Sequence, residues 1–114
     1  MLVKRKKTKF KRNSKNCGVW EYELTSRNLG FAVAEITGRY PDSGTSLNQK
    51  CDLIYYVISG SGKICYDGRF YRINKGDAFL IKKGKKYWVE GKNLIIALPS
   101  SPPWNPRQYK DVKL

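Results

Sequence analysis

The most informative absence in this chain of 114 residues is histidine, which does not occur at any position. Histidine is the side chain that titrates nearest neutral pH and the commonest metal ligand in proteins. Its absence excludes a histidine base and leaves any metal site without imidazole. General acid–base chemistry, if the protein performs any, would fall to tyrosine, lysine or aspartate.

Cysteine is also sparse, with three residues at Cys17, Cys51 and Cys65. An odd, small number without C-x-x-C spacing fits neither a disulfide framework nor a zinc site, and it suits a reducing compartment. Long hydrophobic runs are missing: the longest, residues 53–58 and 94–98, fall far short of the ~20 residues that a membrane helix needs. The basic N-terminus is not followed by the apolar stretch of a secretory signal. We therefore predict a cytoplasmic protein without a membrane segment.

Acidic residues are few, since nine Asp and Glu stand against twenty-three Lys and Arg, for a formal charge of +14. The first fifteen residues hold eight of the bases and no acid, so residues 1–16 are expected to form a basic N-terminal tail. Residues 4–15 are a candidate nucleic-acid patch, because clustered bases attract phosphates. A solvated, partly disordered tail is the more ordinary interpretation, and docking on the barrel or on a partner is the third.

Short apolar runs separated by glycine turns fill the rest of the chain, residues 17–114, which has the length of one domain. β-Branched and aromatic runs with this spacing are typical of an antiparallel sandwich or barrel, and no ten-residue segment has a helical period. The fold class is therefore all-β, with Asp67-Gly68 as a two-residue hairpin turn. We expect strands at residues 17–24, 31–37, 51–58, 63–66, 70–73, 78–81, 87–90 and 94–98.

Two segments outside these strands complete the domain. The polar loop 38–50 is expected at one mouth of the barrel, where loops carry function. The C-terminal segment 99–114 is a Pro/Trp segment, with four prolines and Trp104; it is expected not to pair as a central strand and should wrap along the barrel surface.

The run from Cys51 to Ile58 is apolar on both faces, because residues 53, 55 and 57 alternate with equally apolar residues 54, 56 and 58. A strand with one solvated face would alternate between apolar and polar residues. We expect the outer face to be covered, and favour a homodimer that uses the added N-terminal strands.

The stretch around this strand resembles the cupin superfamily over about residues 30–98. The first cupin block, G-x5-H-x-H-x3/4-E-x6-G, closes on a glycine that matches Gly60. The second block, G-x5-P-x-G-x2-H-x3-N, is matched by Gly76, followed by Asp77, and by Gly84. The resemblance implies a double-stranded β-helix, or jelly-roll, cupin barrel with extra N-terminal strands and the Asp67-Gly68 hairpin between the blocks.

The chain departs from the cupin pattern at the metal ligands. The two-histidine positions fall within residues 46–49, the glutamate position on Leu53 and the third histidine position on Tyr87. Leucine cannot ligate, and serine, asparagine, glutamine and neutral tyrosine are weak ligands for transition metals. We predict no metal and no other cofactor.

The candidate ligand-binding residues are Gln49, Tyr55, Tyr66 and Tyr87, with Asn48 as a second amide beside Gln49. Strand parity predicts that the three tyrosines point into the barrel, where they either hydrogen-bond a ligand or simply fill the interior. Tyr87 is the best candidate for a proton donor. Outside the barrel, four lysines between residues 82 and 86 are either a solvated turn or an attraction for an anionic ligand.

These residues leave three functions open. The first is non-catalytic binding of a small polar or anionic, carbohydrate-like ligand. The second is a structural or regulatory dimer that contacts nucleic acid through the basic tail. The third is a metal-independent sugar isomerase or epimerase, with Tyr87 as the acid and a lysine or Asp52 as its partner.

Overall fold

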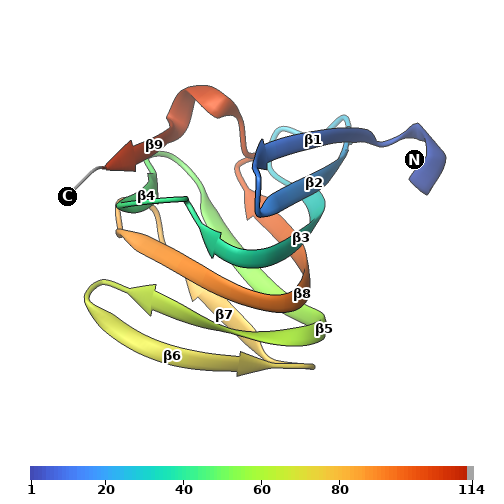
Figure 1. The fold of residues 1–114 in the computed structure, drawn as a ribbon. Coiled ribbons are helices and arrows are strands. Elements are labelled where there is room, and N and C mark those ends of the chain that lie inside the picture. Colours follow the sequence, from blue (N-terminus) through green and yellow to red (C-terminus); the bar gives the residue numbers. More distant parts are fainter. Residues whose placement is uncertain (113–114) are drawn as a thin grey trace.

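Nine β-strands and two short 3-10 helices make up residues 1–112, the part of the chain that the computed structural model describes (Figure 1). The elements in chain order are η1 (Arg5–Lys7), β1 (Lys9–Ser14), β2 (Cys17–Tyr22), β3 (Gly30–Tyr40), β4 (Thr45–Asn48), β5 (Asp52–Tyr66), β6 (Arg69–Asn74), β7 (Ala78–Ile81), β8 (Tyr87–Ser101), η2 (Pro106–Gln108) and β9 (Tyr109–Val112). Within these residues no helix is long and apolar enough to cross a membrane.

The two longest strands, β5 and β8, form the antiparallel centre of the sheet, paired from Asp52 opposite Ser101 to Tyr66 opposite Tyr87. On the other edge of β8 lies β3, which is followed by β2 and β1. β7 and β6 pair with the two halves of β5, and β4 bridges β8 and β9. The sheet curls on itself, so the predicted all-β barrel with additional N-terminal strands is confirmed (Figure 1).

Glycine sets the shape of β5. Gly60 has φ +77, and a Cβ there would lie 2.0 Å from the backbone oxygen of Asn93, so only glycine fits. The register with β8 shifts on both sides of Ser59, and the two strands expected at residues 51–58 and 63–66 are halves of this one bent strand. The turn Asp67-Gly68 has positive φ at both residues and joins Tyr66 to Arg69, as predicted.

The two faces of β5 have different environments. Residues 53, 55 and 57 point into the barrel and are 0–6% exposed, whereas residues 54, 56 and 58 point outward and are 38–45% exposed. β1 and β2 extend the sheet beyond β3 and do not cover this outer face. Within the single chain the N-terminal strands leave this face uncovered, and the homodimer that we favour stays a prediction.

The N-terminal segment also differs from the solvated tail that we expect for residues 1–16. Residues 9–14 form strand β1, which pairs with β2. Phe10 packs on Trp20 with ring centroids 5.0 Å apart, and the Arg5 guanidinium lies 4.4 Å from the Trp20 ring centroid. One aromatic contact and strand pairing thus order a segment whose sequence is almost entirely polar.

The two expected loops contain more strand than the sequence suggests. β3 continues to Tyr40, and β4 lies inside the predicted loop 38–50, so only residues 41–44 and 49–51 remain as connections. Residues 99–101 of the C-terminal segment end β8 and pair with both β3 and β5, so our expectation that this segment cannot pair as a central strand is wrong there. Residues 102–108 cross one end of the barrel, and β9 then pairs with β4 (Figure 1). Residues 113–114 lie outside the described residues.

Candidate ligand-binding cavity

The barrel interior contains a cavity of about 260 Å³ at the end that β2, β3 and the C-terminal segment enclose. A second hollow of about 500 Å³ adjoins it, and the two share Asn13, Tyr40, Trp104 and Tyr109. The inner cavity is lined by residues 13, 17, 19, 21–24, 30–32, 34, 36, 40, 53, 55, 87, 98, 100, 103, 104 and 109. The barrel is therefore open at this end rather than filled.

Four tyrosines converge on the inner cavity, one from each of β3, β5, β8 and β9: Tyr40, Tyr55, Tyr87 and Tyr109. Strand alternation places the first three inside, since Ile36, Leu53 and Val89 are buried on the same sides of their strands. The rings of Tyr55 and Tyr87 meet edge to face, with centroids 6.1 Å apart and planes at 84°. The wall thus offers both aromatic surface and hydroxyl groups.

A chain of hydrogen bonds links this wall to a carboxylate. The Tyr109 hydroxyl lies 2.8 Å from that of Tyr40 and is bonded to the Ser46 hydroxyl. The Ser46 hydroxyl in turn can donate to the Asp111 carboxylate at 3.2 Å. Asp111 lines the outer hollow, so this chain of hydrogen bonds runs from the inner cavity to the outer hollow.

Each hydroxyl in this chain carries one proton, so the protons can be ordered in two ways. When Ser46 donates to Tyr109 and Tyr109 to Tyr40, the Tyr40 proton is free to donate to a ligand. When Ser46 donates to Asp111, the order reverses and the Tyr40 oxygen becomes an acceptor. Tyr40 can therefore donate a hydrogen bond to the oxygen of a ligand hydroxyl or accept one from its proton.

Burial keeps the cavity tyrosines protonated. Desolvation raises the pKa of Tyr40, Tyr55, Tyr87 and Tyr109 above the ordinary value. For Tyr87 the nearby Tyr109 adds to this increase, while the Tyr55 and Asn48 side chains oppose it in part. Burial likewise raises the pKa of the Cys17 thiol, which also lines the cavity, to about 12. None of these groups is an anion near neutral pH.

A buried amide cluster fastens the C-terminal segment over the barrel end. The side-chain oxygen of Asn48, Oδ1, accepts hydrogen bonds from Trp104 Nε1 and Gln108 Nε2, both at 3.0 Å. Gln108 Oε1 accepts from the backbone N–H of Lys50 at 3.2 Å and from the Cys51 thiol at 3.3 Å. Within the described residues, Asn48 Nδ2 is buried without a hydrogen-bond partner of good geometry. This cluster holds Trp104 against the cavity.

The charges around the cavity are mainly acidic. Glu21 and Glu23 line the inner cavity, Glu23 paired with Lys9 Nζ at 2.7 Å, and no lysine or arginine of residues 1–112 lines it. In the outer hollow, Lys11 faces Asp42 and Asp111. This electrostatic setting favours an uncharged ligand over the anionic one that the sequence left open.

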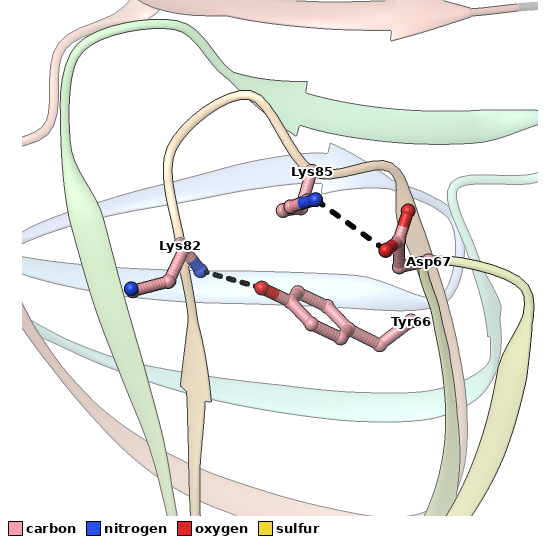
Figure 2. A network of polar contacts seen from close by, with 4 residues as sticks. All are labelled: Tyr66, Asp67, Lys82 and Lys85. Atoms are coloured by element: carbon pink, nitrogen blue, oxygen red, sulfur yellow. Dashed lines mark hydrogen bonds and ion pairs between the residues drawn. The ribbon is translucent and has the colours of Figure 1, made fainter.

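The lysine-rich turn at residues 82–86 lies against a different part of the barrel (Figure 2). The Lys82 backbone N–H donates to the Tyr66 hydroxyl at 3.2 Å, and Lys85 Nζ lies 3.4 Å from Asp67 Oδ2. The Lys83 N–H donates to the Asp52 carboxylate at 2.8 Å. These contacts secure a surface turn and supply no base to the cavity.

Of the four predicted site residues, the structure brings two together. Tyr55 and Tyr87 are buried neighbours in the cavity wall. Tyr66 packs edge to face on Phe79, with centroids 5.2 Å apart, and does not line the cavity. Gln49 is exposed, and its neighbour Asn48 is the buried amide.

Sequence reasoning missed Tyr40, Tyr109 and Ser46. One signal was present, because Tyr40 continues the even-numbered positions that Ala34 and Ile36 occupy on the buried side of β3. Because residues 38–50 were predicted to be a loop, this alternation was not extended to Tyr40. The positions of Ser46 and Tyr109 depend on pairing between β4 and β9, which are far apart in the sequence.

The residues at the cupin ligand positions do not fit a transition metal. Both hydrogen bonds to the Asn48 carbonyl oxygen occupy its lone pairs, Leu53 has no donor atom, and the raised pKa of Tyr87 disfavours a phenolate ligand. In residues 1–112 no three His, Cys, Asp or Glu side chains gather as a metal site would require.

Comparison with known proteins identifies the fold. No protein-family model and no curated protein matches the chain. Among solved structures, the Streptomyces nucleoside dehydratase Pac13 superposes with a TM-score of 0.88 at 13% identity, covering 100% of this chain and 92% of that one. Three Pac13 variants solved with uridine, a histidine-to-glutamine and two tyrosine-to-phenylalanine changes, give TM-scores of 0.86 to 0.89.

Two further structures are similar at 15% identity. KdgF from Halomonas sp. has a TM-score of 0.77, covering 94% of this chain and 97% of that one. Oxalate decarboxylase from Bacillus subtilis has a TM-score of 0.76 and covers 96% of this chain, which spans 31% of the decarboxylase. These similarities show the cupin fold that the glycine spacing predicts.

Proposed function

We propose that the protein binds a small, uncharged ligand with hydroxyl groups on a ring, such as a nucleoside or a sugar, in the tyrosine-lined cavity, and that binding is its function. The observation that carries this proposal is the hydroxyl chain that ends at Tyr40 in the cavity wall. Such a chain can both donate to and accept from a ligand hydroxyl. A purely filling role for the tyrosines would not require it.

The size and chemistry of the cavity support a ligand of this kind. Its volume of about 260 Å³ is near the lower end of ligand pockets, which begin at roughly 300 Å³. The rings of Tyr55, Tyr87 and Trp104 provide apolar surface for the faces of a ring, and the tyrosine hydroxyls provide polar contacts. The uridine complexes of Pac13 make uridine a suitable first probe.

Calorimetric titration of uridine, uridine 5′-monophosphate and methyl glucoside tests the proposal. Uridine or the glucoside should bind, and the phosphate ester should bind more weakly because Glu21 repels it and no lysine or arginine of residues 1–112 lines the inner cavity. Tyr40→Phe should weaken binding about tenfold, the effect of losing one buried hydrogen bond. Tyr56→Phe, which removes a hydroxyl from the outer face of β5, is the matched control and should bind as the wild type does. Equal affinity for the Tyr40→Phe variant and the wild type would contradict the proposal.

Metal-independent acid–base catalysis is the second candidate, and the link from Tyr40 to Asp111 favours it. A substrate proton taken by the Tyr40 oxygen would move the Tyr40 proton to Tyr109, the Tyr109 proton to Ser46 and the Ser46 proton to the Asp111 carboxylate. Tyr87 remains the acid. Asp52, the first residue of β5, does not line the cavity, and its carboxylate accepts from the Lys83 N–H, so it is not placed to be the partner of Tyr87.

Turnover assays on the same compounds separate the two candidates. If the protein is an enzyme, Asp111→Asn should lose turnover and keep ligand affinity, because it removes the proton acceptor and leaves the cavity wall in place. Turnover by the Asp111→Asn variant at the wild-type rate would exclude the relay.

A homodimer remains our proposal for the uncovered outer face of β5 and β7. Ile54, Tyr56, Ile58 and Leu80 expose 38–50% of their surfaces there. Ile54 and Leu80 are direct cross-strand neighbours, so the apolar surface is continuous. A second copy of the chain, packed through the same face, would remove this apolar surface from water.

A further inference from the structure

We propose that the outer face formed by β6, the second half of β5 and the start of β8 binds single-stranded nucleic acid. We call it the cationic–aromatic face. It lies at the opposite side of the sheet from β1, in the lower part of Figure 1. Its residues are Arg39, Lys63, Phe70, Arg72, Trp88 and Lys92, with Cys65 and Glu90 between them and Lys86 directly before the start of β8.

Strand register places these side chains on one surface. Ile64, Ile73 and Val89 point into the barrel and are 0–3% exposed, so the residues that alternate with them point outward. Phe70, Cys65 and Trp88 form one cross-strand row. The neighbouring row consists of Arg72, Lys63, Glu90 and Arg39.

The aromatic row provides a stacking platform. Phe70 is 61% exposed, the most of any aromatic side chain among residues 1–112, although it belongs to a paired strand. Its ring meets that of Trp88 edge to face, with centroids 5.8 Å apart and planes at 80°. Exposed aromatic rings on a sheet stack on unpaired bases and contribute about 1–3 kcal/mol per base.

The cations lie beside these rings, as binding to a sugar–phosphate backbone requires. Lys63 Nζ is 5.2 Å from the Phe70 ring centroid and 5.6 Å from that of Trp88. The Arg39 guanidinium is 4.4 Å from the Trp88 centroid and is fixed by hydrogen bonds to the carbonyls of Pro41 and Gly44. This arrangement pre-orients positive charge next to the stacking surface.

Charge favours a polyanion as the occupant. Five bases and one acid lie on the face, and Arg72, Lys86 and Lys92 are exposed. The acid, Glu90, is 4.0 Å from Lys63, and Asp67 at the adjoining turn is 3.4 Å from Lys85 (Figure 2). A polyanion gains from the remaining positive charge, whereas the uncharged ligand proposed for the cavity does not.

The test is fluorescence anisotropy with a labelled oligo(dT) of about 12 nucleotides, a length in the range of single-strand binding sites. Phe70→Ala should weaken binding about tenfold, as expected for the loss of one stacked base. Lys63→Gln with Arg72→Gln should lower the slope of log affinity against log salt by about 1.4, that is about 0.7 for each lost phosphate contact. A duplex of the same length should bind more weakly than the single strand.

Two control variants test whether the oligonucleotide binds at the cationic–aromatic face, and folding is checked for each variant. Leu80→Ala removes an exposed apolar side chain from another part of the outer surface and should bind as the wild type does. Lys4→Gln with Lys6→Gln changes the basic N-terminal segment and should have a smaller effect than the change at Lys63 and Arg72. Circular dichroism and thermal midpoints establish that each variant is folded. The proposal is overturned if the oligonucleotide does not bind at about 50 mM salt, if Phe70→Ala binds normally, or if only the Lys4 and Lys6 change weakens binding.

Discussion

Tyr55 and Tyr56 are consecutive residues of the same strand, yet the first is 3% exposed and the second 45%. Tyr55 belongs to a closed interior with edge-to-face packing and raised phenol pKa values. Tyr56 lies on an apolar outer surface that nothing in the described chain covers. Composition is similar on the two faces of β5, and curvature decides their environments: the concave face lines the cavity and the convex face is left uncovered.

The largest expected difference between the two faces is in stability. Tyr55→Ala should destabilise the fold by about 3–5 kcal/mol, because it removes a buried ring and leaves a larger hole in the interior. At a protein concentration too low for the proposed dimer to form, Tyr56→Ala should change the free energy of unfolding by less than about 1 kcal/mol, since an exposed side chain loses little on truncation. Urea denaturation of both variants measures the contrast. Equal losses of stability would mean that the outer face is also buried in the folded protein.

The bend that separates the two halves of β5 provides the second prediction. Gly60→Ala should cost about 2–3 kcal/mol, because it combines positive-φ strain with a clash against the Asn93 backbone oxygen. Gly68→Ala has a similar φ of +83 but open space around the added methyl, and should cost only about 1 kcal/mol. Denaturation midpoints measure both variants. Gly68→Ala gives the cost of backbone strain alone, and Gly60→Ala gives the cost of strain together with the clash against Asn93. A Gly68→Ala variant as unstable as Gly60→Ala would show that the collision is unimportant.

The strands and turns were largely predictable because they depend on local signals. Glycine at positive φ marks the bend at Gly60 and the hairpin at Gly68, and parity within β5 and β8 placed Tyr55 and Tyr87 inside. The same parity also predicted Tyr66 inside, where it packs on Phe79 away from the cavity. Local pattern therefore predicts the face of a residue but not its position along the barrel.

The remaining site residues were not predictable from local pattern. Gln49, the amide that the sequence favours, follows the last residue of β4 and is exposed, whereas Asn48, one residue earlier and inside β4, is buried. β4 has only four residues, and its register is set by β9, more than sixty residues later. Residues 9–14 contain one large apolar side chain, Phe10, and become a strand because Trp20 offers it a surface.

Alkaline pH should act mainly on the interior. A phenol or thiol with a raised folded-state pKa stabilises the fold fully below its unfolded pKa, and this stability is lost as pH rises toward the folded pKa. The loss should begin near pH 9 with Cys17, whose pKa rises from 9.0 to about 12, and continue above about pH 10 with the tyrosines. Each such group contributes up to about 1.4 kcal/mol per pH unit.

Unfolding free energies measured from pH 8 to 11 test whether stability falls as pH rises. Cys17→Ala should reduce the loss of stability between pH 9 and 11, whereas Tyr56→Phe, on the outer face, should leave it unchanged. Stability that is constant up to pH 11 would contradict the buried, neutral interior.

The smallest expected effect on folding, and the most direct test of the outer face, is a change in assembly. Leu80→Asp should leave the monomer folded, because Leu80 is 50% exposed, but should convert a dimer to a monomer in analytical ultracentrifugation. Lys75→Asp, on the exposed turn after β6, is the charge control and should leave assembly unchanged. A wild-type protein that is monomeric at micromolar concentration would rule out the homodimer.

The central claim, that the tyrosine cavity receives a ligand, is tested most directly by the fluorescence of Trp104. Of the three tryptophans, Trp104 lines the cavity, while Trp20 and Trp88 do not. In a Trp20→Phe, Trp88→Phe variant, titration with uridine or methyl glucoside should change the Trp104 emission to saturation, and adding Tyr40→Phe should shift the midpoint about tenfold higher. An emission that stays constant throughout both titrations would contradict the account.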